Sequence, residues 1–157
     1  MINTPKLASR LLCLAVPLAL LLGLSANLHA QQAMSISLNG GAEVPPVKTS
    51  ATGSGQLKVL PDHTVNGSIK VSGMQPTMAH IHEAAAGKNG PPIITLSKTG
   101  SDSFTVPSDA KLTDAQYTSY TAGNLYVNVH SAEHPNGELR AQLPRPESAG
   151  MPMRPAY

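Results

Sequence analysis

Residues 55 to 71 read Gly55-Gln-Leu-Lys-Val-Leu60, Pro61-Asp-His-Thr64 and Val65-Asn-Gly-Ser-Ile-Lys-Val71. The first and third runs alternate apolar and polar residues, a pattern typical of half-buried β-strands. The middle run contains the proline and the aspartate that favour a turn. The stretch therefore predicts an antiparallel β-hairpin with His63 at its tip.

The same alternation recurs between turn signals along most of the chain. Further strands are predicted at 34–38, 77–82, 93–96, 103–106, 124–130 and 138–143. One helix is predicted over 113–120, because Thr113 and Gln116 can form a capping box and Gly123 can end the helix. About eight short strands with one short helix favour an all-β fold, a Greek-key antiparallel β-sandwich or barrel.

The first thirty residues differ in composition from the rest. Lys6 and Arg10 precede an apolar run over 11–24, and Leu28-His-Ala30 resembles a cleavage site, so residues 1–30 are expected to form a signal peptide. The apolar run is shorter than the about 20 residues of a membrane span, and no span is expected in the mature form. We therefore expect an exported protein, periplasmic or secreted.

The remaining chain is expected to form one domain over 31–143 and a proline-rich disordered tail over 144–157. Cys13 lies in the leader, so the domain has no disulfide and no thiolate ligand. Lys6 and Arg10 also lie there, and the other nine of the 11 basic residues balance the 9 acidic ones. This balance gives no support to a nucleic-acid partner, which would favour a clustered basic face.

Two histidines lie one residue apart in a predicted strand. Residues two apart on a strand share a face, with Cα atoms about 6.5 to 7 Å apart, so His80 and His82 project side by side. His130 ends the strand 124–130 on its polar face, and His134 follows in a loop. If the two strands are neighbours, the first three imidazoles can meet, with His134 as a fourth ligand. Imidazole sites without thiolates suit copper(II) or zinc.

The sequence also allows other interpretations of these residues. The histidine pair can belong to a structural hydrogen-bond network or contact a protein partner. Methionines at 74, 78, 151 and 153 would suit copper(I), although methionine is usually core filler. Glu138 and Arg140 alternate on the last strand and are expected to form a mutual or cross-strand salt bridge. Asn128 is expected to satisfy backbone groups of a loop, and Glu43 to cap a loop or bind a ligand.

Three ordered motifs resemble those of the CHRD domain, named after chordin. They are Gly40-Gly-Ala-Glu-Val-Pro-Pro-Val47, Ala79-His-Ile-His82 with Gly87-Lys-Asn-Gly-Pro91, and Leu125-Tyr-Val-Asn-Val-His130 leading to Pro135-Asn-Gly-Glu-Leu-Arg-Ala-Gln-Leu143. The similarity spans about Ile36 to Leu143 and implies a β-rich extracytoplasmic module. Ala141 stands where the family commonly has glycine. Chordin antagonises bone morphogenetic proteins, but a shared fold does not transfer that partner to a single domain.

The site alone is also similar to the copper-binding strand of Cu/Zn superoxide dismutases, which are Greek-key β-barrels. His80 and His82 match that strand, with His130 as the third ligand, whereas the disulfide is missing and no bridging histidine or zinc loop is recognisable. Three hypotheses follow. The first is a non-catalytic domain that binds copper or zinc, the second is a protein-protein interaction module with structural histidines, and the third is a dismutase-like copper enzyme.

Overall fold

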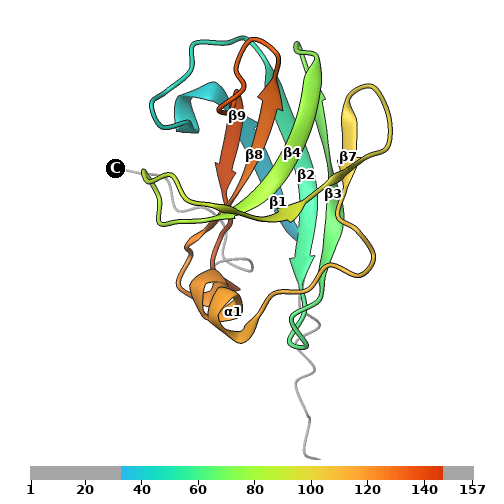
Figure 1. The fold of residues 1–157 in the computed structure, drawn as a ribbon, viewed down its shortest axis with the longest axis vertical. Helices are drawn as coiled ribbons and strands as arrows, with labels where there is room; N and C mark the ends of the chain where they lie inside the picture. The colour runs from blue at the N-terminus through green and yellow to red at the C-terminus, as the bar shows by residue number, and fades with distance from the viewer. Residues whose placement is uncertain (1–32, 147–157) are drawn as a thin grey trace, which may run out of the picture.

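The computed structural model describes residues 33–146 and contains a nine-stranded antiparallel sheet (Figure 1). The signal peptide expected over 1–30 and most of the tail expected over 144–157 lie outside the described residues. The strands are β1 (Met34–Asn39), β2 (Thr52–Val59), β3 (Val65–Ser72), β4 (Pro76–Glu83), β5 (Pro92–Thr95), β6 (Ser97–Lys98), β7 (Ser103–Thr105), β8 (Leu125–Ser131) and β9 (Leu139–Gln142). A 3-10 turn η1 (Gly40–Ala42) follows β1, and helix α1 (Asp114–Thr121) precedes β8.

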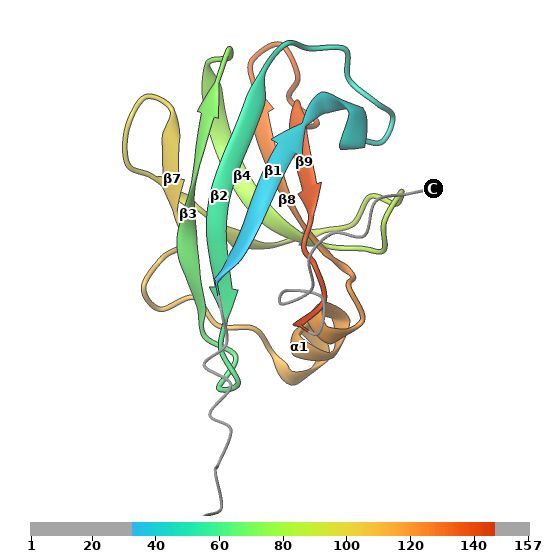
Figure 2. The same ribbon diagram turned by 180° about the vertical axis from the view of Figure 1, so that it is seen from behind.

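The sheet curls into a nearly closed barrel. Its strand order is β5-β4-β8-β9-β1-β2-β3-β7-β6. The two end strands, β5 and β6, are separated in the chain by Leu96 alone, whose backbone N–H donates to the carbonyl of Ala79 at 2.9 Å. Figure 2 shows β9, the last strand of the chain, lying beside β1, next to β2 and β3. The expected all-β barrel with one short helix is confirmed.

The barrel interior is filled by the side chains of alternate residues along each strand. Along β1, Met34, Ile36 and Leu38 are buried and the residues between them are exposed. Ile69 of β3 and Phe104 of β7 pack on the same core. The alternation that predicted the strands is therefore the alternation between core and surface.

The predicted hairpin is present as β2 and β3, with Val59 opposite Val65. His63 lies in its turn with φ of 73°. β2 begins at Thr52, three residues before the predicted start, because it pairs with β1 on one side and β3 on the other. Its glycines permit close strand packing: a Cβ on Gly55 would lie 2.5 Å from the Ile69 side chain.

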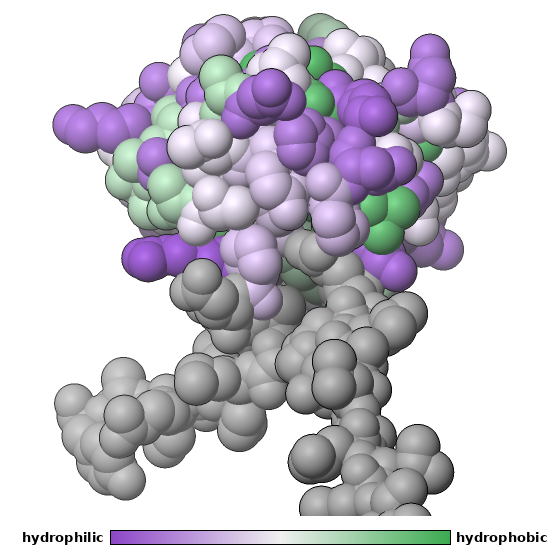
Figure 3. Space-filling model, turned by 90° about the horizontal axis from the view of Figure 1, so that it is seen from below, coloured by the Kyte–Doolittle hydropathy of each residue, from purple (hydrophilic) through white to green (hydrophobic). Residues whose placement is uncertain are grey.

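Helix α1 covers one end of the barrel. The capping box is confirmed, since the Thr113 side chain accepts from the backbone of Gln116 at 3.2 Å and the Gln116 side chain accepts from that of Thr113 at 2.9 Å. Gly123 follows the helix with φ of 80°. Figure 3 views the molecule from this end, where hydrophilic and neutral residues predominate and apolar ones form small separate groups. Within 33–146 no helix is long and apolar enough to cross a membrane.

Strand β8 is buried on both faces, as is most of its neighbour β9. All seven residues from Leu125 to Ser131 are buried. Leu125, Val127 and Val129 point into the barrel, so Tyr126, Asn128 and His130 point outward. The outward side chains are covered by loops, and this covered polar layer holds the candidate site.

Candidate metal centre

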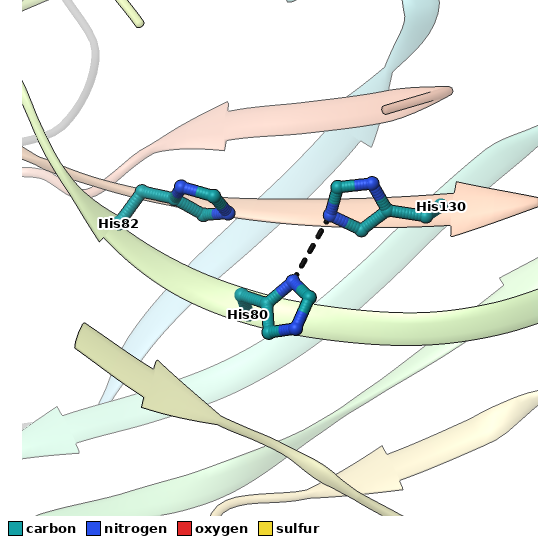
Figure 4. A group of neighbouring side chains, drawn as sticks. All are labelled: His80, His82 and His130. Carbon is teal, nitrogen blue, oxygen red and sulfur yellow. Dashed lines mark hydrogen bonds between the residues drawn. The ribbon is translucent and has the colours of Figure 1, made fainter. Parts of the chain in front are cut away.

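The pairing of β4 with β8 brings three histidines together. His130 lies opposite Met78 in the register of the two strands, and His80 lies opposite Asn128. His80, His82 and His130 therefore project from one face. Nδ1 of His80 lies 3.0 Å from Nε2 of His130, and ligand nitrogens of all three residues lie within 4.8 Å of one another. Figure 4 shows the three rings converging in front of the two strands.

Backbone carbonyls fix which nitrogens face the centre. Nδ1 of His82 lies 2.9 Å from the carbonyl of Gly90, and Nδ1 of His130 lies 3.0 Å from that of Pro135. A carbonyl oxygen only accepts, so each Nδ1 carries the proton and each Nε2 carries a lone pair. Metal-binding histidines characteristically donate their second N–H to such an acceptor.

The Nε2 lone pair of His82 accepts no hydrogen bond from the described residues. This nitrogen is also buried. His80 differs, because its Nδ1 faces the Nε2 lone pair of His130 and therefore donates to it. Binding of a metal through Nδ1 of His80 would replace this hydrogen bond, and the ring proton would then be carried by Nε2 so that the imidazole stays neutral.

The spacing of the nitrogens suits a tetrahedral metal. Metal–imidazole bonds of about 2.0 to 2.1 Å place tetrahedral ligand atoms about 3.4 Å apart. The 3.0 Å separation between His80 and His130 and the 4.8 Å limit for the whole set bracket this value. Small ring rotations would bring three nitrogens to one ion, leaving a fourth position open.

Burial keeps the three imidazoles neutral. It lowers the pKa of His80, His82 and His130 below the ordinary 6.5, and positive charge on neighbouring histidines lowers the pKa of His80 further. The hydrogen bonds to Gly90 and Pro135 act in the opposite direction and offset part of this effect. Neutral imidazole is the form that binds metals, so the site is ready for a cation at neutral pH.

Tyr126 holds the ring of His82 in place. The two rings stack with centroids 4.9 Å apart and an interplanar angle of 14°. The guanidinium carbon of Arg140 lies 3.5 Å from the centre of the Tyr126 ring. Because β4 and β9 flank β8, His82 and Arg140 approach Tyr126 from opposite sides. The hydroxyl of Tyr126 also accepts from the backbone of Gly90 at 3.2 Å. Tyr126 was not among the residues expected at the site, since a tyrosine in a strand carries no signal of this role.

Arg140 anchors the loop that covers the histidines. It is 1% exposed and donates to the side chain of Asn89 at 3.0 Å and to the carbonyl of Lys88 at 2.7 Å. The expected salt bridge with Glu138 is not formed among the described residues; Glu138 instead accepts from the Thr49 hydroxyl at 2.8 Å. The loop oxygens complete the hydrogen bonds of the guanidinium, which explains the difference.

Glu43 and Asn128 form a second buried polar pair beside the histidines. Glu43 is 5% exposed and Asn128 is 3% exposed. The Asn128 amide donates to Glu43 at 3.5 Å rather than to loop backbone, contrary to expectation. Burial raises the pKa of Glu43 to about 7, although Arg140 and Asn128 both lower it. Oε1 of Glu43 and Oδ1 of Asn128 have no hydrogen-bond partner within 33–146.

The other two domain histidines lie apart from this cluster. His134 does not belong to the group of convergent ligand nitrogens. It lines an open groove of about 710 Å³ together with Lys48, Met74 and Glu133. His63 stacks on Tyr117 with centroids 4.2 Å apart.

The comparison with protein families agrees with this architecture. The model of the CHRD domain matches residues 34–143. The chain belongs to the CHRD domain family. No curated protein and no solved structure matches the chain. In this CHRD domain, the three convergent histidines and the two loops whose Gly90 and Pro135 carbonyls orient them lie inside the matched range.

Proposed function

We propose that this CHRD domain binds a copper or zinc ion through His80, His82 and His130 and serves in metal handling outside the cytoplasm, without catalysing a reaction. The observation that carries the proposal is the buried, unpartnered Nε2 of His82, next to the facing nitrogens of the other two rings. A buried lone pair without a donor is unfavourable, and a cation at the centre would satisfy it. His134 is not needed for this site.

The surroundings support storage or delivery of an ion rather than turnover. His82 and His130 are buried beneath loops, and His80 is only partly exposed, so access to the centre is narrow. Imidazole ligands without thiolates suit copper(II) and zinc. The leader-like residues 1–30 support export, and a domain without cysteine does not depend on the redox state of its compartment.

Calorimetric titration tests the site. Protein expressed as the full chain is purified with chelator and titrated with Zn(II) or Cu(II), beside the variants His82→Ala, His63→Ala and His134→Ala. The wild type should bind one ion, and His82→Ala should lose at least about tenfold in affinity. His63→Ala and His134→Ala should match the wild type, since neither ring joins the cluster.

Thermal unfolding provides an independent measure. An ion that binds only the folded state adds about 2.7 kcal/mol at a hundredfold excess over its dissociation constant. Equal uptake by the wild type and His82→Ala would make the histidines structural. A search for a protein partner would then become the better course.

A further inference from the structure

Met78 occupies an unusual position beside the histidines. It is 45% exposed, and within residues 33–146 no other large apolar side chain is classed as exposed. Most other large apolar side chains of residues 33–146 are in the core or packed against it. Met78 therefore lies on the surface for a reason that core packing does not supply.

The strand register places Met78 at the edge of the cluster. A register shift separates Pro76 from Met78, and from Met78 onward β4 pairs regularly with β8. Met78, His80 and His82 alternate along β4 and so share the outward face. Across the strands, Met78 lies directly opposite His130. It therefore neighbours one histidine along its own strand and another across the ladder.

The thioether is within reach of the centre. Directly opposed residues of an antiparallel pair have Cα atoms about 4.5 to 5.5 Å apart, and methionine has an unbranched side chain with three rotatable bonds. The exposure of Met78 leaves these rotations free. Rotation of the side chain can bring the sulfur toward the nitrogens of His80 and His130 without moving the backbone.

The histidine next to Met78 along β4 is the most exposed of the three. His82 and His130 are buried, whereas His80, the histidine next to Met78 on β4, is partly exposed. Three imidazoles leave one position of a tetrahedral ion unfilled. A thioether is a soft ligand that selects copper(I), whereas zinc and copper(II) favour nitrogen and oxygen donors.

We infer that Met78 is the fourth ligand of the centre and that copper(I) is the ion that the site prefers. This inference rests on the proposed function and deepens it by identifying the ion. It assigns to the exposed methionine a role in selection among metals: the three histidines hold the ion, and the sulfur distinguishes copper(I) from zinc.

Competition for copper(I) tests the assignment. The full chain and its variants Met78→Leu and Met74→Leu are titrated without oxygen against a chromogenic copper(I) chelator. Leucine has a similar volume but no sulfur, and Met74, which lines the groove of His134 and packs against the core, serves as the control methionine. Met78→Leu should lower copper(I) affinity at least about tenfold, with less than about twofold change for zinc, whereas Met74→Leu should match the wild type.

X-ray absorption at the copper edge provides a second readout. A sulfur ligand should be present in the copper(I)-loaded wild type and absent in Met78→Leu. If the wild type binds neither copper nor zinc, the proposed function fails. If it binds copper(I) and Met78→Leu binds as tightly, or loses copper(I) and zinc affinity equally, only the role of Met78 is overturned.

Discussion

Replacing Glu43 with glutamine is expected to stabilise the domain at alkaline pH while leaving its stability near pH 4 almost unchanged. The carboxyl group is buried, and its Oε1 lies close to Oδ1 of Asn128, which also has no partner among the described residues. Both oxygens lie beside Gly137, because a Cβ added to Gly137 would be 2.8 Å from the Glu43 oxygen and 2.5 Å from the Asn128 oxygen. A protonated carboxyl or a glutamine amide supplies a donor there, and a carboxylate does not.

The size of the effect follows from the pKa of Glu43. Burial raises this pKa from an ordinary 4.5 to about 7. The folded state therefore holds the proton more tightly than the unfolded state, and the associated stability is fully present below pH 4.5 and lost as pH rises through 7. At about 1.4 kcal/mol per pH unit, the loss amounts to about 3 kcal/mol. For a domain of this size that corresponds to about 10 to 15 °C in Tm.

Urea unfolding at pH values from 4 to 9 measures the effect. The chain has no tryptophan, so unfolding is followed by far-ultraviolet circular dichroism, with chelator present. The histidines titrate in both proteins, and the difference between Glu43→Gln and wild type removes their contribution. This difference should grow by about 3 kcal/mol between pH 4 and pH 8. Glu133→Gln, which removes an exposed carboxylate, should differ from wild type by less than about 0.5 kcal/mol throughout.

Two results would refute this reasoning. A difference that does not change with pH would mean that Glu43 titrates alike in the folded and unfolded states. A Glu43→Gln variant less stable than wild type at pH 8 would mean that attraction between the carboxylate and Arg140 outweighs the effect of burial.

Two further predictions concern the covered face of the barrel. Arg140→Met should lower the free energy of unfolding by about 1 to 3 kcal/mol, because the loop oxygens of Lys88 and Asn89 lose their donor; urea unfolding that shows no loss of stability would contradict it. Zinc release on acidification should have its midpoint at lower pH than in a His-X-His peptide, because burial lowers the pKa values of His80, His82 and His130; a pH titration with a zinc indicator that gives equal midpoints would argue against burial as the cause.

Local pattern was enough to predict most of the fold. The alternation of apolar and polar residues has a period of two, and each strand carries it within its own sequence. The hairpin at 55–71, the helix cap at Thr113 and the shared face of His80 and His82 all depend on residues close together in the chain, and the structure contains all three. The short strand β6 was not predicted, since two residues are too few to show a period.

The sequence by itself determined the strands, the polar face of β8 and the histidine pair, because these follow from neighbouring residues and backbone geometry. Tertiary structure alone decided that β4 pairs with β8 in a register that sets His130 beside His80, and that His134 stays outside the cluster. It also decided which loop carbonyls orient the rings and that Glu43 is buried beside Asn128. The physical reason is that strand register and loop packing are set by closing the barrel across 50 residues of chain between His80 and His130, a constraint that no local period records.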